Sequence, residues 1–215
     1  AASDVYKRQL VSATGALSIP TLGGSGFGYE LAQQFNLPLI SRRASLVPFM
    51  FSDEIKDLCE ELSGVSTPVT ISSNQKKFEE SMLFTHRGLS GPAVLQISNY
   101  WKPGNEIRID LLPGIIGADF LTNEKNINHK TTIKKSLASL LPKALLLKLE
   151  ELWWPLQKDQ FLTEISNNEL MIIGNHLNAW TLKPSSTEGY RTAEVTLGGV
   201  DTDAINSKTM EIKEQ

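Results

Sequence analysis

The chain has 215 residues and a formal net charge of −3, from 21 basic and 24 acidic side chains. This length can bury a core, and an apolar fraction of 40% excludes an intrinsically disordered chain. The near-balance of charge argues against a nucleic-acid partner and against a polybasic membrane surface. The single cysteine, Cys59, excludes an intramolecular disulfide and a cysteine-cluster metal site. With no apolar run near the ~20 residues that a membrane span needs, we expect a soluble, cytoplasmic globular protein.

The first part of the chain combines a polar start with a glycine-rich segment. Residues 1–9 are expected to be a non-native tail, with a mobile native tail as the alternative. Residues 10–13 form a short apolar run closed by Thr14-Gly15, which predicts a buried strand that ends in a tight turn. The glycines between 23 and 28 precede a predicted helix over residues 29–35. Their spacing fails the Gly-x-Gly-x-x-Gly test, so a flexible loop is favoured over a phosphate-binding loop.

The next section, to residue 112, is predominantly β in pattern. Residues 46–51 read as an extended segment, and residues 69–71, 82–84 and 106–111 as strands. Gly91-Pro92 predicts a helix with proline at its first position.

The segment Thr85 to Pro92 places His86 and Arg87 beside a glycine-rich turn. These two side chains could bind a carboxylate or polarise a carbonyl group. The alternative is purely structural, with Ser90 as a helix cap and Arg87 in a surface salt bridge.

The last third is helical and then returns to a strand. Ile133 to Leu141 carries one apolar stripe, a second helix ends before Pro155, and Ser166 to Glu169 fits a capping box that opens a third helix. A strand over 193–196 is followed by Gly198-Gly199. Paired glycines allow the backbone to approach a flat ligand, although a hairpin turn or a bulge gives the same pattern. The order α/β, β, α, β predicts one domain interrupted by an inserted one.

No catalytic nucleophile or metal site is evident in this pattern. The chain has no Gly-x-Ser-x-Gly elbow, and Cys59 lies in an amphipathic stretch where a buried thiol is expected. His129 and His176 have no partner at metal-ligand spacing. The catalytic residues therefore stay unassigned.

Taken in order, the motifs resemble one family, the HI0933-like or BaiN-like FAD-dependent oxidoreductases of bacteria, also described as aminoacetone oxidase family FAD-binding enzymes. The matching segments are Ala13-Thr14-Gly15-Ala16 with Ser18 and Pro20, Gly24 to Ala32, Leu83 to Pro92, Ile109 to Pro113, Ala193 to Val200, and Lys208 to Glu211. Two positions depart from the family pattern, Ala16 in place of a glycine and Ile212 in place of a serine. The family's Gly-x-Gly-x-x-Gly fingerprint would lie upstream of Leu10, so an internal fragment is expected.

The resemblance implies a partial Rossmann-like FAD-binding domain interrupted by an insert, an α/β fold with an α+β insert. The implied boundaries are 10–44 for the partial FAD-binding domain, 45–190 for the insert (β-rich 45–115, helical 116–182) and 191–215 for the return to the FAD-binding domain. The implied cofactor-binding residues are Ala13, Thr14, Gly15, Thr196, Gly198, Gly199 and Val200. Thr85, His86 and Arg87 are implied on the substrate side.

The resemblance also implies a function. The full-length protein is expected to transfer a hydride between FAD and a small organic substrate, with NAD(P)H as an optional further cofactor, and the fragment alone to be inactive. No nucleic-acid, membrane or metal partner is expected, and the oligomeric state stays open. The alternative is a non-enzymatic binding or interaction module that retains the inserted fold.

Overall fold

The computed structural model describes residues 11–213, so the expected tail and Leu10 lie outside the described residues. The chain divides into two compact units: unit 1 contains residues 1–45 and 189–215, and unit 2 contains residues 46–188. The fold is mixed α/β, and every strand pair among the described residues is antiparallel. None of the helices in residues 11–213 has both the length and the apolar character needed to cross a membrane.

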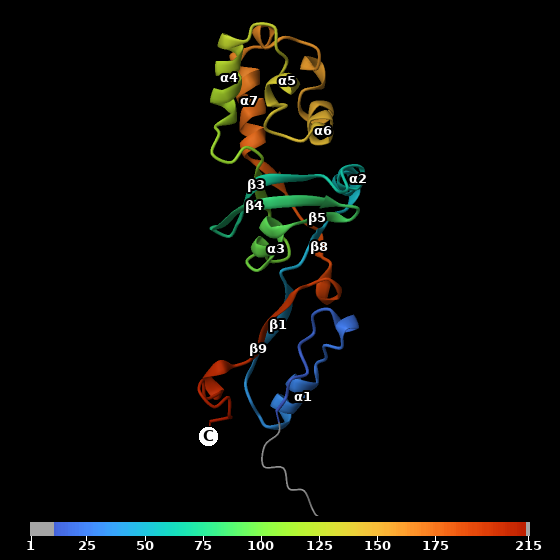
Figure 1. The fold of residues 1–215 in the computed structure, drawn as a ribbon, viewed down its shortest axis with the longest axis vertical. Coiled ribbons are helices and arrows are strands. Elements are labelled where there is room, and N and C mark those ends of the chain that lie inside the picture. The colour runs from blue at the N-terminus through green and yellow to red at the C-terminus, as the bar shows by residue number, and fades with distance from the viewer. Residues whose placement is uncertain (1–10, 214–215) are drawn as a thin grey trace, which may run out of the picture. The chain divides into compact units, whose positions relative to one another are not determined.

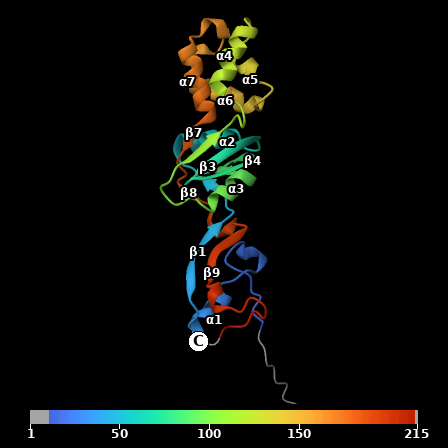
Figure 2. The same ribbon diagram turned by 90° about the vertical axis from the view of Figure 1, so that its left-hand side faces the viewer.

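Unit 1 is built on a two-stranded sheet of β1 (Leu39–Ser45) and β9 (Val195–Val200), which run side by side in Figure 2. The register is irregular between Ile40 and Arg43, which indicates a β-bulge. Helix α1 (Phe27–Gln34) contacts both strands. Three short 3₁₀ turns complete the unit, at Pro20–Leu22, Gly189–Arg191 and Thr202–Ala204.

Two sequence predictions in unit 1 are wrong. Residues 11–16 form no strand, and Val11 is 83% exposed. A short apolar run becomes a strand only when a neighbouring strand takes its backbone hydrogen bonds, and no described strand pairs with this one. Gly198 and Gly199 lie inside β9 rather than after it.

Unit 2 contains a seven-stranded sheet in the order β7-β6-β3-β4-β5-β2-β8. The strands are β2 (Phe49–Met50), β3 (Ser66–Ser73), β4 (Lys76–Thr85), β5 (Gly88–Ser90), β6 (Ile107–Asp110), β7 (Trp180–Leu182) and β8 (Ser186–Thr187). No pairing among the described residues joins the two edge strands, β7 and β8, so the sheet does not close into a barrel. The predicted strands of this region are confirmed, and each is extended or trimmed by a few residues.

Helices α2 (Asp53–Glu61) and α3 (Pro92–Ser98) pack on this sheet, and α3 begins at the predicted proline. The glycines before α3 have a packing reason. A Cβ on Gly88 would collide with the Phe49 carbonyl oxygen of the neighbouring strand β2. Gly91 has a φ of +91°, and a Cβ there would lie 2.8 Å from the Ser81 carbonyl oxygen. Gly88 therefore allows β5 to pair closely with β2, and Gly91 allows the strand-to-helix turn.

The remaining helices form a separate group in unit 2 (Figure 1): α4 (Gly117–Ile127), α5 (Ile133–Leu137), α6 (Lys143–Trp153) and α7 (Asn167–Asn178). Helices α4 and α7 approach so closely that a Cβ on Gly174 would collide with the backbone of Gly117 and Ala118. The predicted capping box is confirmed: the Glu169 backbone N–H donates to Ser166 Oγ at 3.2 Å, and the Ser166 N–H donates to the Glu169 carboxylate at 3.0 Å. Hydrogen bonds from Ser166 lower the pKa of Glu169.

One ion pair ties α5 to α6. Lys134 Nζ lies 2.8 Å from Glu150 Oε2, and the Glu150 side chain is only 2% exposed. A carboxylate in this position depends on its cation, because an unpaired buried charge keeps the full cost of desolvation. The next residue, Lys135, forms no ion pair with any described residue.

We expect Lys134→Ala to lower the free energy of unfolding by about 3 kcal/mol, because it leaves the Glu150 carboxylate buried without a partner. Lys135→Ala is the matched control and should change it by less than about 0.5 kcal/mol. Urea unfolding of the 215-residue chain measures both. Equal effects of the two substitutions would contradict the proposed dependence of Glu150 on Lys134.

The lone cysteine lies in the core of unit 2. Cys59 on α2 is 1% exposed, and burial raises the pKa of its thiol to about 12. Its thiolate is therefore absent near neutral pH, and the side chain acts as a small apolar group.

We expect the Cys59 thiol of the folded 215-residue chain to resist a disulfide reagent such as DTNB at pH 8, because both exposure and thiolate are lacking. The chain should react fully once it is unfolded in guanidinium chloride. Rapid reaction under native conditions would show that α2 opens far more readily than its packing indicates.

Candidate functional site

Unit 1 contains a pocket of about 700 Å³, here called the unit 1 pocket. Its volume lies within the range of ordinary ligand sites. The lining residues come from the segment before α1, from α1 and the turn that follows it, and from the end of β9 and the chain after it. They are Ser12, Ala13, Thr14, Gly15, Gly28, Tyr29, Leu31, Ala32, Phe35, Leu37, Val200, Ile205, Met210 and Ile212.

Close backbone packing forms one wall of the unit 1 pocket. A Cβ on Gly24 would lie 2.7 Å from the Ala16 carbonyl oxygen, and a Cβ on Gly28 would lie 3.2 Å from Thr14 Oγ1. The Ser25 N–H also donates to the Thr14 carbonyl oxygen at 3.1 Å. The glycines therefore let the loop before α1 lie directly on residues 12–16. The glycine-rich segment, which the sequence predicted to be a flexible loop, is therefore packed against the rest of unit 1.

Tyr29 connects α1 to the strands. Arg42 on β1 lies over its ring, with the guanidinium carbon 4.6 Å from the ring centroid. From the other strand, a Cβ on Gly199 would lie 3.3 Å from the Tyr29 ring. Gly199 also has a φ of +124°, so a side chain there would be strained as well as crowded. A glycine at this position leaves the Tyr29 ring in its place on the pocket wall.

The predicted cofactor-binding residues fall into two groups. Ala13, Thr14, Gly15 and Val200 line the unit 1 pocket. Thr196, Gly198 and Gly199 lie on β9 and are not among the lining residues.

The second group supports the pocket wall. Thr196 Oγ1 accepts a hydrogen bond from the Leu17 N–H at 3.2 Å and lies 2.9 Å from Ser18 Oγ. A Cβ on Gly198 would collide with the carbonyl oxygen of Ser41 on β1. Thr196 therefore anchors the segment before α1, and Gly198 allows β9 to pair closely with β1.

The character of the unit 1 pocket fits a flat, mainly apolar ring system. None of the described side chains that line it is charged, and most of them are aliphatic or aromatic. Gly15 and Gly28 also line it, where the chain packs closely on Gly24 and on Thr14. An uncharged, mainly apolar lining of this kind is compatible with the isoalloxazine ring of a flavin, so the residues present fit such a group.

Thr85, His86 and Arg87 lie in unit 2, in the turn between β4 and β5. Thr85 Oγ1 accepts hydrogen bonds from the N–H groups of Arg87 and Gly88, at 3.4 Å and 3.2 Å, so it shapes the turn. The Arg87 carbonyl oxygen accepts from the Phe51 N–H at 3.1 Å. The His86 side chain is exposed. Of the three, only His86 and Arg87 present side chains that the turn does not use.

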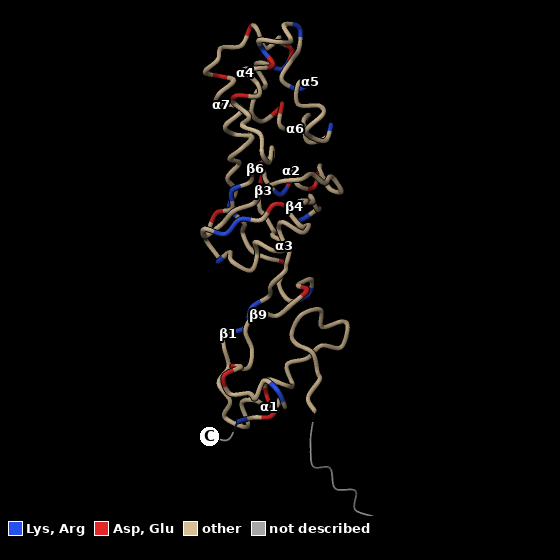
Figure 3. The backbone as a smooth tube through the Cα atoms, turned by 60° about the vertical axis from the view of Figure 1, so that its left-hand side comes forward, with Lys and Arg blue, Asp and Glu red and all other residues tan. Residues whose placement is uncertain are grey.

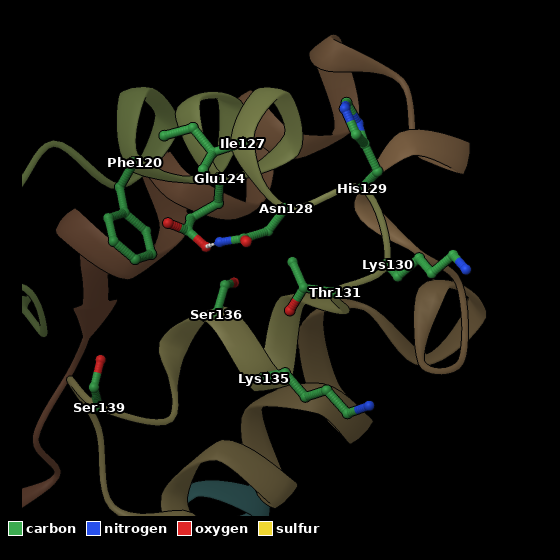
Figure 4. A pocket seen from close by; sticks show the side chains of 10 residues that line it. All are labelled: Phe120, Glu124, Ile127, Asn128, His129, Lys130, Thr131, Lys135, Ser136 and Ser139. Carbon is green, nitrogen blue, oxygen red and sulfur yellow. Dashed lines mark hydrogen bonds between the residues drawn. The ribbon is translucent and has the colours of Figure 1, made fainter.

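Unit 2 has a second pocket, of about 760 Å³, between α4 and α5 (Figure 4); we call it the helical groove. Its lining residues are Phe120, Glu124, Ile127, Asn128, His129, Lys130, Thr131, Lys135, Ser136 and Ser139. Asn128 Nδ2 donates to Glu124 Oε2 at 2.9 Å, which is the dashed bond in Figure 4. Neither Lys130 nor Lys135 forms an ion pair within the described part of the chain.

The described residues contain no group of three or more His, Cys, Asp or Glu side chains that could hold a metal ion.

Several residues of the unit 1 pocket were missed from the sequence. Phe35, Met210 and Ile212 are 61%, 75% and 47% exposed, which is unusual for large apolar side chains. Phe35 belongs to no motif, and although Met210 and Ile212 lie in or beside the matching segment Lys208 to Glu211, an apolar side chain there gave no sign of a site. Tyr29 lies within the recognised glycine-rich segment, but only the glycines of that segment were considered as candidates.

Two curated relatives cover almost the whole chain. A protein of Haemophilus influenzae named "Ribosomal RNA dihydrouridine synthase" is 48% identical over 207 residues, which are 95% of this chain and 50% of that protein. A protein of Escherichia coli with the same name is 45% identical over 206 residues, 95% of this chain and 51% of that protein. The chain therefore spans about half the length of the curated relatives it matches.

These names correct the predicted function, together with its alternative, and the predicted partner. Both relatives are named as enzymes that act on ribosomal RNA. The predicted hydride transfer to a small organic substrate is wrong, and so are the alternative of a non-enzymatic module and the exclusion of a nucleic-acid partner. The exclusion rested on the net charge of −3, which says nothing about how cations are distributed over the surface.

A family model described as "HI0933-like protein barrel and H2TH domain" matches residues 43–195, which is more than half of the chain. The match agrees with the family resemblance of the sequence motifs. The chain belongs to the HI0933-like family.

Proposed function

We propose that the full-length protein reduces uridine in ribosomal RNA to dihydrouridine with a bound flavin. The observation that carries this proposal is the identity of 48% and 45%, over 95% of this chain, to two proteins named ribosomal RNA dihydrouridine synthase. An rRNA-modifying role also fits a cytoplasmic location. The 215-residue chain alone is proposed to be inactive, because it spans only about half of those relatives.

The reaction sets the chemistry that the site must support. Reduction of uridine adds one hydride and one proton across the C5–C6 double bond of the base. A reduced flavin supplies the hydride when bound, with FAD proposed from the resemblance and NAD(P)H proposed as the source of its electrons. The protein must then hold the flavin ring, exclude water around it and position the RNA.

We assign the flavin to the unit 1 pocket. Ala13, Thr14 and Gly15 offer backbone along one wall, and Val200 contributes an apolar contact on another. Thr196, Gly198 and Gly199 act indirectly. Thr196 fixes the segment before α1, Gly198 allows β9 to pair closely with β1, and Gly199 leaves room for the Tyr29 ring. In this proposal unit 1 is the partial FAD-binding, Rossmann-like domain, and unit 2 is the inserted substrate domain.

His86 and Arg87 are proposed to face the substrate. Hydrogen bonds to Thr85 Oγ1 and from the Phe51 N–H hold the turn that carries them. The two side chains therefore extend from a backbone of fixed conformation. An arginine suits a phosphate group, and a histidine can donate or accept a proton near neutral pH.

We expect Gly199→Val to abolish flavin binding in the full-length protein. The new side chain would press on the Tyr29 ring and would be strained at a φ of +124°. Gly23→Val is a matched control, because Gly23 also has a positive φ, +90°, but a Cβ there meets nothing within 4 Å. The measurement is the flavin absorbance per mole of purified, folded protein. Equal flavin content in both variants would remove Gly199 from the site.

The activity itself can be tested in a strain of Escherichia coli that lacks its relative. We expect the full-length protein, but not Gly199→Val, to restore the dihydrouridine that is missing from the ribosomal RNA of that strain. Mass spectrometry of nucleosides from purified rRNA gives the measurement. Flavin-loaded, well-expressed protein that leaves the rRNA unmodified would overturn the proposed function.

A further inference from the structure

A third pocket lies in unit 2, at the hairpin end of β3 and β4; we call it the hairpin groove. Its volume is about 420 Å³. It is lined by Ser72, Ser73, Asn74, Gln75, Lys76, Lys77, Glu106, Ile107, Arg108 and Thr181. Three of these side chains are cationic and one is anionic, so the groove carries a local positive charge. In Figure 3 a blue stretch marks this end of β4.

Strand register places the cations on one exposed row. Ser72 on β3 is opposite Lys77 on β4 and also opposite Arg108 on β6, and Arg108 is opposite Thr181 on β7. Directly opposed residues of neighbouring strands point to the same face. Lys77 and Arg108 are therefore separated by two inter-strand spacings, about 10 Å. The row consists of two cations that flank a serine and end at a threonine.

The cations of the hairpin groove are not neutralised internally. Lys76, Lys77 and Arg108 form no ion pair with any residue in the described part of the chain. Some other lysines of unit 2 are paired, as Lys148 is with Glu61 and Glu151. The three cations of the hairpin groove are thus available to pair with an anion from another molecule.

The backbone around the groove is fixed. Asn74 and Gln75 both have a positive φ, 48° and 64°, which is the conformation of a tight two-residue hairpin turn. Asn74 Nδ2 donates to the Tyr100 carbonyl oxygen at 2.7 Å, and Ser73 Oγ donates to the Glu106 carbonyl oxygen at 2.9 Å. The Tyr100 ring in turn holds Lys76, whose Nζ lies 5.4 Å from the ring centroid. The turn next to Lys77 is therefore held in one conformation, which reduces the backbone ordering that binding of an anion would require.

We propose that the hairpin groove binds the sugar-phosphate backbone of the ribosomal RNA substrate. This inference rests on the proposed function, which supplies the polyanion, and it adds the surface that receives it. Lys77 and Arg108 contact phosphate oxygens, Lys76 adds to the positive field, and the Ser72 and Thr181 hydroxyls are within the same row for hydrogen bonds. The helical groove is the less favoured surface, because it brings two lysines and His129 together with Glu124 and lacks a comparable row.

The test compares two charge-matched double variants of the full-length protein, Lys77→Ala with Arg108→Ala and Lys130→Ala with Lys135→Ala. Binding of fluorescein-labelled fragments of deproteinised ribosomal RNA is followed by fluorescence anisotropy over a series of salt concentrations. We expect the hairpin-groove variant to bind about tenfold more weakly and to lower the slope of log K against log[salt] by roughly 1.5, the value for two lost phosphate contacts. The helical-groove variant should bind as the wild type does. The variant Lys77→Arg with Arg108→Lys, which keeps both charges, should retain most of the affinity.

Each other outcome has a definite meaning. Unchanged binding by the hairpin-groove variant, or equal loss in both double variants, overturns the assignment while the proposed function stands, provided that the wild type forms dihydrouridine in rRNA. A wild type that neither binds nor modifies rRNA overturns the proposed function and this inference together. Urea unfolding of each variant, with an unchanged midpoint, excludes misfolding as the cause of weak binding.

Discussion

The pairing of β1 with β9 is the constraint on which unit 1 depends. It joins residues 39–45 to residues 195–200, which stand on opposite sides of unit 2 in the sequence. Thr196 in β9 holds the segment before α1, and the Asp201 N–H donates to the Pro38 carbonyl oxygen at 2.9 Å just beyond the strands. Leu37 and Val200, near the ends of the two strands, both line the unit 1 pocket. Without this sheet, the unit 1 pocket would lose β9, the strand that contributes Val200 to its wall.

Local signals in the sequence predicted local structure well. Pro92 begins α3, and Ser166 caps α7 with Glu169, because a proline ring and a capping side chain act within a few residues. The strand expected at residues 10–13 fails, and Gly198-Gly199 falls inside a strand, because both depend on which distant segment lies alongside. The order of strands in the unit 2 sheet could not be predicted either. Its edge strands β8 and β7 have only two and three residues, and in the sequence both follow the helical group.

The candidate site shows the same division. Ala13, Thr14, Gly15 and Val200 could be named from motifs, and all four line the unit 1 pocket. Other apolar residues of the wall, such as Phe35 and Leu37, have no motif and depend on how the chain folds back. The charge argument failed for a related reason. A net charge of −3 sums over the whole chain, whereas strand register can place cations such as Lys77 and Arg108 on one row.

The sequence separation within the β1–β9 sheet also orders events during synthesis. All of unit 2 is one continuous stretch, residues 46–188, and its core can form from contacts within that stretch. Residues 39–45, by contrast, leave the ribosome early and have no partner strand until residues 195–200 follow. Contacts that close such a long loop form late. The nascent chain therefore carries an exposed strand and half a pocket while the inserted part is already able to fold, and the lining of the unit 1 pocket is complete only after Ile212, twelve residues beyond the end of β9, has emerged.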